Sequence, residues 1–136
     1  MARIPEGGAV AYRLDQGEAR FLLVTAKSHP DRWIFPKGRI EEGEEAARTA
    51  LRELREEAGV RANFVGPLGR VKMRTDRGKI AVEYFLVSFL DEGTPEPGRE
   101  RRWVSYAEAR ALLSHEDIKI ILDQANALVA NGPEAP

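Results

Sequence analysis

The chain has 136 residues, no cysteine, and 21 basic against 22 acidic residues, which gives a formal net charge of −1. This length favours one domain with a sizeable core, which we expect to span residues 1–130. The lack of cysteine excludes a disulfide framework, a thiol nucleophile and a cysteine-ligated zinc site. The first residues are not typical of a secretory signal, and no apolar run approaches membrane-spanning length. We therefore expect a cytoplasmic protein without a membrane partner.

The first third of the chain predicts strands separated by turn residues. Apolar residues favour strands over residues 8–14 and 21–26, around a turn at residues 15–17. A third, short strand over residues 33–35 ends at Pro36, which cannot donate a ladder hydrogen bond. The chain therefore begins with β structure, and a helical pattern follows.

Residues 44–58 predict a helix, because they are mostly good helix formers and contain no proline. Gly43 suits the position before the helix, and Gly59 suits the left-handed position after its last turn. Two acids at the start suit the positive end of the helix dipole. Apolar residues recur at helical spacing and predict a narrow stripe that faces the core. The stripe consists of Ala47, Ala50, Leu51, Leu54 and Ala58.

Three acids of this helix, Glu53, Glu56 and Glu57, lie at i, i+3 and i+4, so their side chains converge beside the apolar stripe. Their repulsion and the negative end of the helix dipole make this placement locally unfavourable. Such conflicts are expected at functional sites, and a hard cation such as Mg²⁺ or Mn²⁺ would offset the repulsion. The alternative is a solvated acidic face that arginines neutralise. Those arginines are Arg48, Arg52 and Arg55.

The second half of the chain predicts a long hairpin over residues 63–75 and 79–90, with its turn at residues 76–78. Together with the earlier elements, this hairpin indicates a mixed sheet packed between helices. The remaining elements are a loop over residues 91–98, a strand over 102–104, helices over 106–113 and 116–129, and a disordered tail over 131–136.

Residues 38–60, GRIEEGEEAARTALRELREEAGV, resemble the signature of the Nudix hydrolase family. That signature is Gly, five residues, Glu, seven residues, Arg-Glu, an apolar residue, any residue, Glu-Glu, any residue, Gly and an apolar residue. The resemblance implies an α/β fold, a Nudix-type α/β/α sandwich with a mixed β-sheet, and metal-dependent hydrolysis of a phosphoanhydride. The fixed positions are filled by Gly38, Glu44, Arg52, Glu53, Leu54, Glu56, Glu57, Gly59 and Val60.

The same resemblance implies roles for residues of the helix. Glu53, Glu56 and Glu57 match the positions that hold the metals and that act in catalysis, and which carboxylate acts as the base stays open. Glu44 and Arg52 match a pair that braces the preceding loop and orients the carboxylates. Arg52 therefore joins the candidate catalytic residues as an orienting group.

Two further metal ligands are expected outside the helix. Gly38 matches a glycine at a tight turn, which would hold the Lys37 carbonyl where related proteins use a backbone oxygen as a ligand. Gly59 is expected to act only as a helix cap. Glu83 is a lone carboxylate on an apolar strand face, which is costly unless it is paired or bound to a metal. The alternatives are a cross-strand ion pair of Glu83 with Arg70, Lys72 or Arg74, and rival acids within residues 91–100.

Basic residues near the signature are candidates for binding phosphates. Residues 41–57 contain seven acids and three bases, whereas residues 70–79 contain five bases and one acid. An acidic metal face beside a basic strand suits a polyphosphate, although two unrelated solvated surfaces would give the same pattern. Trp33, Tyr84 and Trp103 would stack on a base or pack in the core. The candidate substrate-binding residues are Lys37, Arg39, Arg70, Lys72, Arg74 and Arg101.

Residues 28–34, SHPDRWI, and 98–103, GRERRW, resemble segments of the diadenosine polyphosphate and diphosphoinositol polyphosphate hydrolase branch. Residues 33–38, WIFPKG, look closer to the diadenosine side, because inositol-side members tend to have a glycine where Lys37 stands. We therefore predict an Mg²⁺-dependent pyrophosphohydrolase, with Mn²⁺ as a second metal. Its substrates would be nucleoside or dinucleoside polyphosphates such as diadenosine polyphosphates, and not a nucleic acid polymer.

Two alternatives stay open at this point. The first keeps the hydrolase and changes the substrate to diphosphoinositol polyphosphates, which a dense ring of basic residues around the site would favour. The second is a non-catalytic Nudix module that senses a nucleotide, and loss of the catalytic glutamates would mark it. All three glutamates are present. The sequence leaves the oligomeric state open.

Overall fold

The computed structural model describes residues 2–132. Met1 and residues 133–136 lie outside this range, and so does most of the tail that was predicted to be disordered. Within residues 2–132, no helix is both long enough and apolar enough to cross a membrane.

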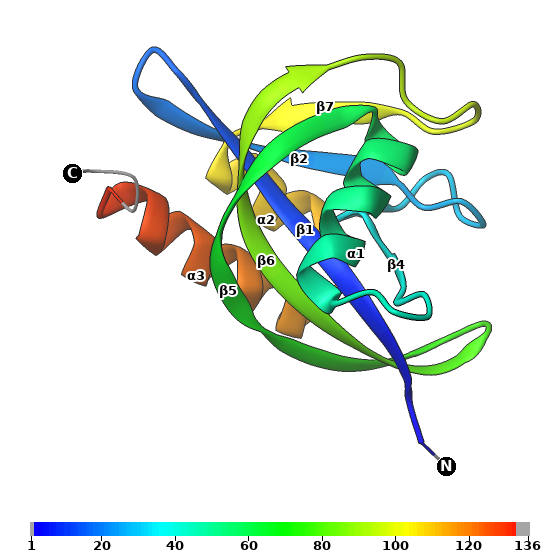
Figure 1. Ribbon diagram of the computed structural model, residues 1–136. Helices are drawn as coiled ribbons and strands as arrows, with labels where there is room; N and C mark the ends of the chain where they lie inside the picture. The colour runs from blue at the N-terminus through cyan, green and yellow to red at the C-terminus, as the bar shows by residue number, and fades with distance from the viewer. Residues whose placement is uncertain (1, 133–136) are drawn as a thin grey trace.

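A mixed sheet of seven strands forms the middle layer of the molecule (Figure 1). Its main path has the order β3-β2-β1-β6-β5, while β4 pairs with β1 and β7 pairs with β2. The β1–β6 pair is parallel and the other pairs are antiparallel, which confirms the predicted mixed sheet. The strands are β1 (Ile4–Asp15), β2 (Glu18–Thr25), β3 (Trp33–Ile34), β4 (Lys37–Arg39), β5 (Val60–Thr75), β6 (Gly78–Glu92) and β7 (Arg101–Val104).

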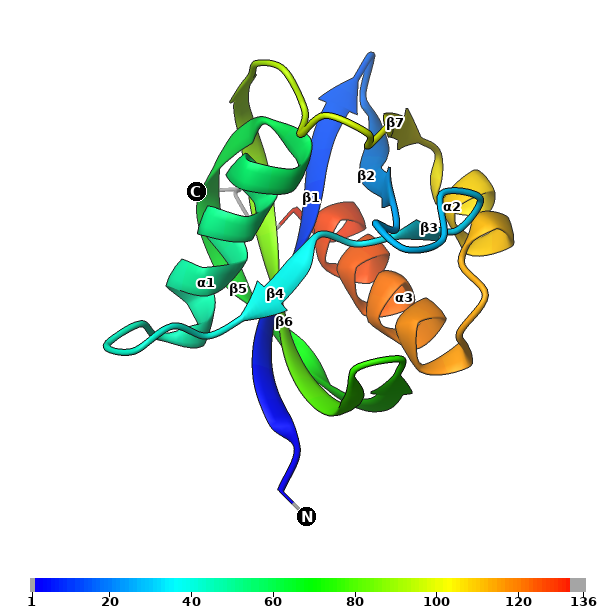
Figure 2. The ribbon, with the colours of Figure 1, turned by 90° about the vertical axis from the view of Figure 1, so that its right-hand side faces the viewer.

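Helices cover both faces of this sheet (Figure 2). One face carries α1 (Ala46–Glu53), which continues into the π-helical turn η1 (Leu54–Ala58). The other face carries α2 (Tyr106–Leu112) and α3 (Glu116–Ala130). This arrangement confirms the predicted α/β/α sandwich.

Each helical layer buries its own apolar cluster against the sheet. The predicted stripe of the first helix packs on β1, β2 and β6, and Ala50, Leu54 and Ala58 are fully buried. On the opposite face, Ile121 and Leu122 of α3 pack on the alternate residues of the same strands. Because β1, β2 and β6 are covered on both faces, they read as nearly continuous apolar runs.

Strand β1 changes its neighbour halfway along its length, and this change positions the site. Its C-terminal half pairs with β2, from Tyr12 opposite Phe21 to Asp15 opposite Glu18. Its N-terminal half pairs with β4 instead, where Gly8 lies opposite Lys37. The sheet therefore opens beside the first helix, and the short strand β4 occupies part of that opening.

Candidate functional site

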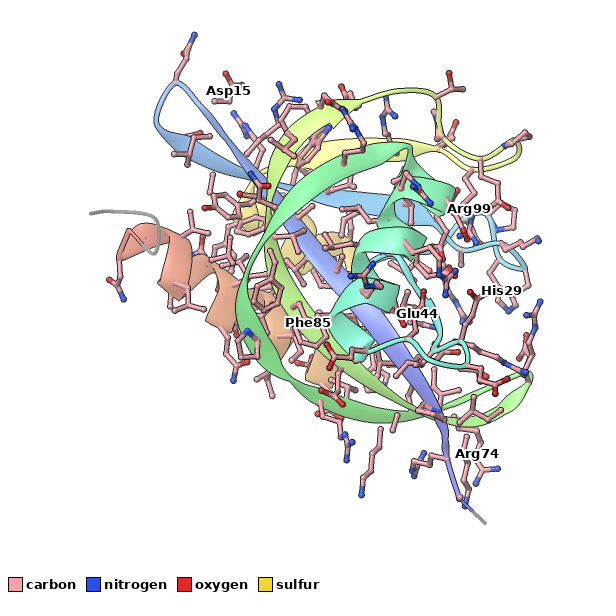
Figure 3. The ribbon with its side chains drawn as sticks, in the orientation of Figure 1. Asp15, His29, Glu44, Arg74, Phe85 and Arg99 are labelled. Carbon is pink, nitrogen blue, oxygen red and sulfur yellow. The ribbon has the colours of Figure 1, made fainter. Side chains whose placement is uncertain are left out.

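A cleft of about 1050 Å³ lies where β1 and β2 part. Its walls come from residues 26–35, β4, the α1–η1 segment, the β5–β6 turn and the start of α3. His29 and Asp76 face each other from two of these walls, with His29 Nε2 3.2 Å from Asp76 Oδ2. In Figure 3, His29, Glu44 and Arg99 lie on the same side of the view as α1, whereas Asp15, the last residue of β1, lies on the other side.

The helix that carries the acids starts two residues later than predicted. Its N-cap is Glu45, and the predicted cap Gly43 lies in the preceding loop with φ of +79°. Glu44 stays outside the helix because its carboxylate accepts hydrogen bonds from the Thr49 hydroxyl (2.6 Å) and from Arg52 Nε (2.6 Å). The loop is thus tied to the helix by a side chain.

The helix also widens into a π-helical turn at Leu54, where an uninterrupted α-helix was predicted. Such turns inside α-helices occur often at functional sites. Within this turn the two final acids differ in exposure, because the Glu57 side chain is 7% exposed while the Glu56 side chain is 51% exposed. Gly59 then ends the turn with φ of +70°, which confirms the predicted left-handed cap.

Arg52 links the loop, the helix and β4. Its guanidinium donates to Glu44 (2.6 and 3.0 Å), to Glu53 (2.9 Å), to Glu56 (3.2 Å) and to the Arg39 carbonyl (3.0 Å). The Arg52 bonds lower the pKa of Glu44 to about 2, and Glu44 in turn raises the pKa of Arg52. The predicted bracing pair of Glu44 and Arg52 is therefore present as a network that holds two of the three candidate metal ligands.

Gly38 is required by close packing against Glu53. A Cβ atom at Gly38 would lie 2.2 Å from the Glu53 carboxylate carbon, so any side chain there would displace that carboxylate. The Lys37 carbonyl is part of the peptide bond to Gly38, so it is adjacent in the chain to the glycine that packs against Glu53. The structure therefore brings the Lys37 backbone and Glu53 to the same wall of the cleft.

Glu57 is the least satisfied charge in the site. Its Oε1 is buried without a hydrogen-bond partner among the described residues, and Arg99 Nη1 is 3.5 Å away. Burial, followed by the adjacent Glu53 carboxylate, raises the pKa of Glu57 to about 9. Arg99 is itself committed elsewhere, because it donates to Glu96 Oε2 (2.6 Å) and to the Thr25 carbonyl (2.9 Å).

The carboxylates and the backbone carbonyl of the cleft are suitable ligands for a hard divalent cation, but the carboxylates do not converge on one point. Within residues 2–132, no three acidic or histidine side chains converge closely enough to form a metal cluster. Arg52 donates hydrogen bonds to Glu53 and to Glu56. Glu57 nevertheless keeps a buried oxygen without a hydrogen-bond partner among the described residues in the same cleft, and hard oxygen ligands are what Mg²⁺ and Mn²⁺ prefer.

The cleft gathers most of the residues that the sequence selected. Besides the three glutamates and Arg52, the substrate candidates Lys37, Arg39 and Arg74 line it. Lys37 is already engaged, because its Nζ donates to Glu6 Oε1 at 3.0 Å. Of the three aromatic candidates, Trp33 and Tyr84 line the cleft, whereas Trp103 packs edge-on against Phe89, as the core alternative predicts.

Four selected residues lie elsewhere. Glu83, the tentative metal ligand, is not part of the cleft wall and is 3.6 Å from Arg70 on the neighbouring strand, which is the cross-strand ion pair kept as its alternative. Arg70 and Lys72 are exposed on β5 outside the cleft. Arg101 donates to the carbonyls of Ala58 and Gly93, so it anchors the loop before β7. The placement of these residues supports neither metal nor phosphate binding in the cleft.

The sequence reasoning missed Glu6 and Arg99. Glu6 is buried on β1 and reaches Lys37 only because β1 and β4 pair across thirty-one positions of the chain. Glu6 lies before the strand that was predicted over residues 8–14, between Pro5 and two glycines, so no local pattern marked it as a buried carboxylate. Arg99 belongs to the GRERRW segment, in which Arg101 was selected instead.

Comparisons with known proteins agree with this geometry. A family model described as the NUDIX domain matches residues 5–124. Diphosphoinositol polyphosphate phosphohydrolase 3-beta of Bos taurus is 35% identical over 106 residues, which cover 74% of this chain and 65% of that protein. Diphosphoinositol polyphosphate phosphohydrolase 2 of Mus musculus is 31% identical over 113 residues, which cover 80% of this chain and 63% of that protein. The chain thus spans just under two thirds of these relatives.

Solved structures share the fold at lower identity. A C. elegans Ap4A hydrolase superposes with a TM-score of 0.78 at 21% identity, covering 94% of this chain and 99% of that chain. The NUDIX domain of Shewanella oneidensis NrtR, complexed with ADP ribose, gives a TM-score of 0.76 at 24% identity, covering 95% of this chain and 90% of that chain. The family model and the complete signature at the cleft show that this chain belongs to the NUDIX domain family.

Proposed function

We propose that the protein is a divalent-metal-dependent pyrophosphohydrolase that cleaves phosphoanhydride bonds of nucleoside or dinucleoside polyphosphates. The observation that carries the proposal is Glu57, a buried carboxylate beside Glu53 whose Oε1 has no hydrogen-bond partner among the described residues and only a 3.5 Å ion pair with Arg99. A buried charge of this kind is costly unless a cation or proton compensates it. The family and the names of its polyphosphate-hydrolysing relatives support the same reaction class.

The proposed metal is Mg²⁺, with Mn²⁺ as a substitute. Its ligands would be Glu53, Glu56, Glu57 and the Lys37 carbonyl, all of which line the cleft. When bound, such a cation polarises a phosphoryl oxygen, activates water and neutralises phosphate charge. Arg52 limits the positions that Glu53 and Glu56 can adopt, and Arg99 offsets part of the charge on Glu57.

The cations of the cleft fall into an inner and an outer group. The inner cations, Lys37, Arg52 and Arg99, are each committed to a carboxylate. The outer cations have no hydrogen bond or ion pair from their side chains within residues 2–132, so they are available for phosphates. These outer cations are Lys27, Arg32, Arg39, Arg74 and Arg77.

The names of the similar curated proteins favour a second candidate substrate, a diphosphoinositol polyphosphate. The composition of the cleft favours it less. Seven acidic residues line the cleft together with eight basic ones, so the walls do not form the dense basic ring that such a substrate would need. A sensor without activity is a third candidate, which the presence of all three signature glutamates disfavours.

A phosphate-release screen tests the proposal. The panel contains diadenosine polyphosphates, nucleoside triphosphates, ADP-ribose and diphosphoinositol polyphosphates, each with Mg²⁺ and with excess chelator. We expect Mg²⁺-dependent release, highest with a dinucleoside polyphosphate. Full turnover in chelator would refute the metal dependence, and tight binding without cleavage anywhere would favour the sensor. The highest activity on diphosphoinositol compounds would keep the hydrolase and change its substrate.

A further inference from the structure

A second polar cluster lies in the same cleft, on the other side of β4 from the glutamates. Successive side chains of a strand point to opposite faces, so Gly38 packs against Glu53 while Lys37 points the other way, toward the α3 side of the sheet. There Lys37 Nζ binds Glu6 Oε1 at 3.0 Å, and the two side chains are 21% and 10% exposed. The buried ion pair is not part of the family signature.

This cluster has hydrogen-bonding capacity that the protein does not use. The ammonium of Lys37 has three donor hydrogens, and Glu6 is its one partner within residues 2–132. Glu6 Oε2 has no partner in the same range, and neither does the hydroxyl of Tyr84, which lines the cleft. The Tyr84 hydroxyl opens onto the cleft, so it is available to donate to a bound ligand. Burial and the charges of Glu6 and Glu57 raise the pKa of Tyr84, so its hydroxyl stays protonated and donates.

The backbone is shaped to hold Tyr84 in this place. A Cβ atom at Gly8 would lie 2.5 Å from the Tyr84 ring, so the ring rests directly on the strand. Phe35 contacts the ring edge-on, with centroids 6.1 Å apart. The position of the hydroxyl is therefore fixed by packing, as a recognition group needs to be.

Apolar side chains surround this polar cluster inside the cleft. A flat, apolar group with polar atoms at its edge would bury its faces against them and reach the unused donors and acceptor. A nucleobase has this chemistry, whereas an inositol ring that carries phosphates on most of its carbons would bring charge against apolar walls. The apolar lining consists of Ile4, Trp33, Met73, Ile80, Leu113 and Ile118.

We propose that Glu6, Lys37 and Tyr84 form a subsite that binds the nucleobase of a nucleotide substrate, with Glu6 as the specificity-determining residue. The inference rests on the proposed function and adds the substrate class that the cleft selects. Glu6 accepts from an N–H of the base, and Lys37 and Tyr84 donate to its acceptors. The Glu6 carboxylate also repels any phosphate that would enter this end of the cleft, so phosphates remain on the side of the signature glutamates and the outer cations.

Nucleoside binding without metal tests this subsite separately from hydrolysis. In excess chelator, the parent protein is titrated with adenosine, guanosine, cytidine and uridine, and binding is followed by calorimetry. We expect at least one nucleoside to bind, and we expect Glu6→Gln and Tyr84→Phe each to weaken that binding about tenfold. Glu42→Gln is the matched control, because Glu42 is exposed and does not line the cleft, and it should leave nucleoside binding unchanged.

Absence of nucleoside binding by the parent, or unchanged binding in both folded variants, would overturn the subsite. Tyr84→Phe keeps the ring and Glu6→Gln keeps the shape, so circular dichroism can verify that each variant is folded. Hydrolysis provides an independent readout, because Glu6→Gln should lower kcat/KM for a dinucleoside polyphosphate relative to a diphosphoinositol polyphosphate. If no phosphoanhydride is cleaved but Glu6→Gln still weakens nucleoside binding, the proposed function fails and the subsite survives.

Discussion

Glu44 and Glu57 stand just before and at the end of the same helical segment, and their carboxylates have opposite surroundings. Glu44 accepts hydrogen bonds from Arg52 and Thr49, which hold its pKa at about 2. Glu57 is buried beside another carboxylate, its Oε1 has no hydrogen-bond partner among the described residues, and its pKa is raised to about 9. The first carboxylate has short hydrogen bonds within the protein, whereas the second has only a 3.5 Å ion pair with Arg99 to offset its burial. The first therefore belongs to the scaffold, and the second marks the reactive end of the site.

The largest expected effect comes from removing charge at the reactive end. We predict that Glu57→Gln and Glu56→Gln each lower kcat/KM by at least about 10²-fold with Mg²⁺, because a metal ligand or base is lost. Glu42→Gln is the matched control, since Glu42 is exposed in the loop before the helix. Steady-state phosphate release gives the comparison. Parent-like activity in Glu57→Gln would place the chemistry elsewhere.

Metal addition should stabilise the folded protein through the glutamates at the reactive end of the helical segment. A cation bound only by the folded state contributes about 2.7 kcal/mol at a hundredfold excess over its Kd. We therefore predict that millimolar Mg²⁺ raises the Tm of the parent, measured by calorimetry. The triple variant with Gln at positions 53, 56 and 57 should lose this response and be at least as stable as the parent without metal. An unchanged Mg²⁺ shift in the triple variant would locate the metal outside this cluster.

A change at the scaffold end, around Glu44 and Arg52, should lower the stability of the protein even without metal. Arg52→Ala removes the cationic partner of Glu44, whose side chain is 11% exposed, and leaves this mostly buried carboxylate with only the Thr49 hydroxyl and the Glu41 backbone N–H as donors. We expect a loss of about 2 kcal/mol in the free energy of unfolding, measured with urea. Arg48→Ala is the control on the same helix, because Arg48 is exposed and has no ion pair within residues 2–132. Equal losses in both variants would contradict a special role of Arg52.

The contrast between the two ends could be predicted only in part. Motif spacing and helical periodicity correctly placed the apolar stripe, the Glu44–Arg52 pair and the cap at Gly59. The π-helical turn was missed because the local residues favour a continuous α-helix. The burial of Glu57 was likewise not predicted. Helical periodicity therefore identifies the cluster of Glu53, Glu56 and Glu57, but it does not predict how much each of these side chains is exposed.

Contacts between strands that are distant in the sequence were harder to predict than contacts within the helix. Glu83 was selected as a carboxylate on a predicted apolar strand face, whereas Glu6 lies outside the strand predicted over residues 8–14 and was not considered. The register of the sheet separates them, because Glu83 lies opposite Arg70 outside the cleft whereas Glu6 faces Lys37 inside it. No local pattern contains that register. The extent of the domain over residues 1–130 stays a prediction.

Glu57 also predicts a pH dependence of stability in the metal-free protein. Its folded pKa is raised above the ordinary value of 4.5, so its contribution is fully present below pH 4.5 and is lost as the pH rises through about 9. We expect the free energy of unfolding of the parent to fall more steeply than that of Glu57→Gln over this range, because only the parent carries the titrating carboxylate. Urea unfolding in chelator at pH 5, 7 and 9 measures the difference. Parallel curves would show that Glu57 is already compensated, most directly by Arg99.

The smallest expected effect comes from the outer cations, which we expect to influence the preference for phosphate chain length. Arg74 and Arg77 line the mouth of the cleft without a side-chain partner in the described chain, so each extra phosphate of a longer substrate can meet one of them. We predict a higher kcat/KM for tetraphosphate-bridged than for triphosphate substrates. The double change Arg74→Ala and Arg77→Ala should reduce that ratio about threefold, because exposed ion pairs contribute little.

Arg70 and Lys72 provide the matched control for this comparison, since they lie on the same strand as Arg74 but outside the cleft. Changing both to Ala should leave the ratio unchanged, although the net charge changes by the same amount. Added salt should compress the parent ratio toward that of the Arg74/Arg77 variant, because the exposed charges are screened. An equal loss in both double variants would show that the general field of the basic strand selects chain length. A loss confined to Arg74 and Arg77 would show that specific contacts at the mouth of the cleft select it.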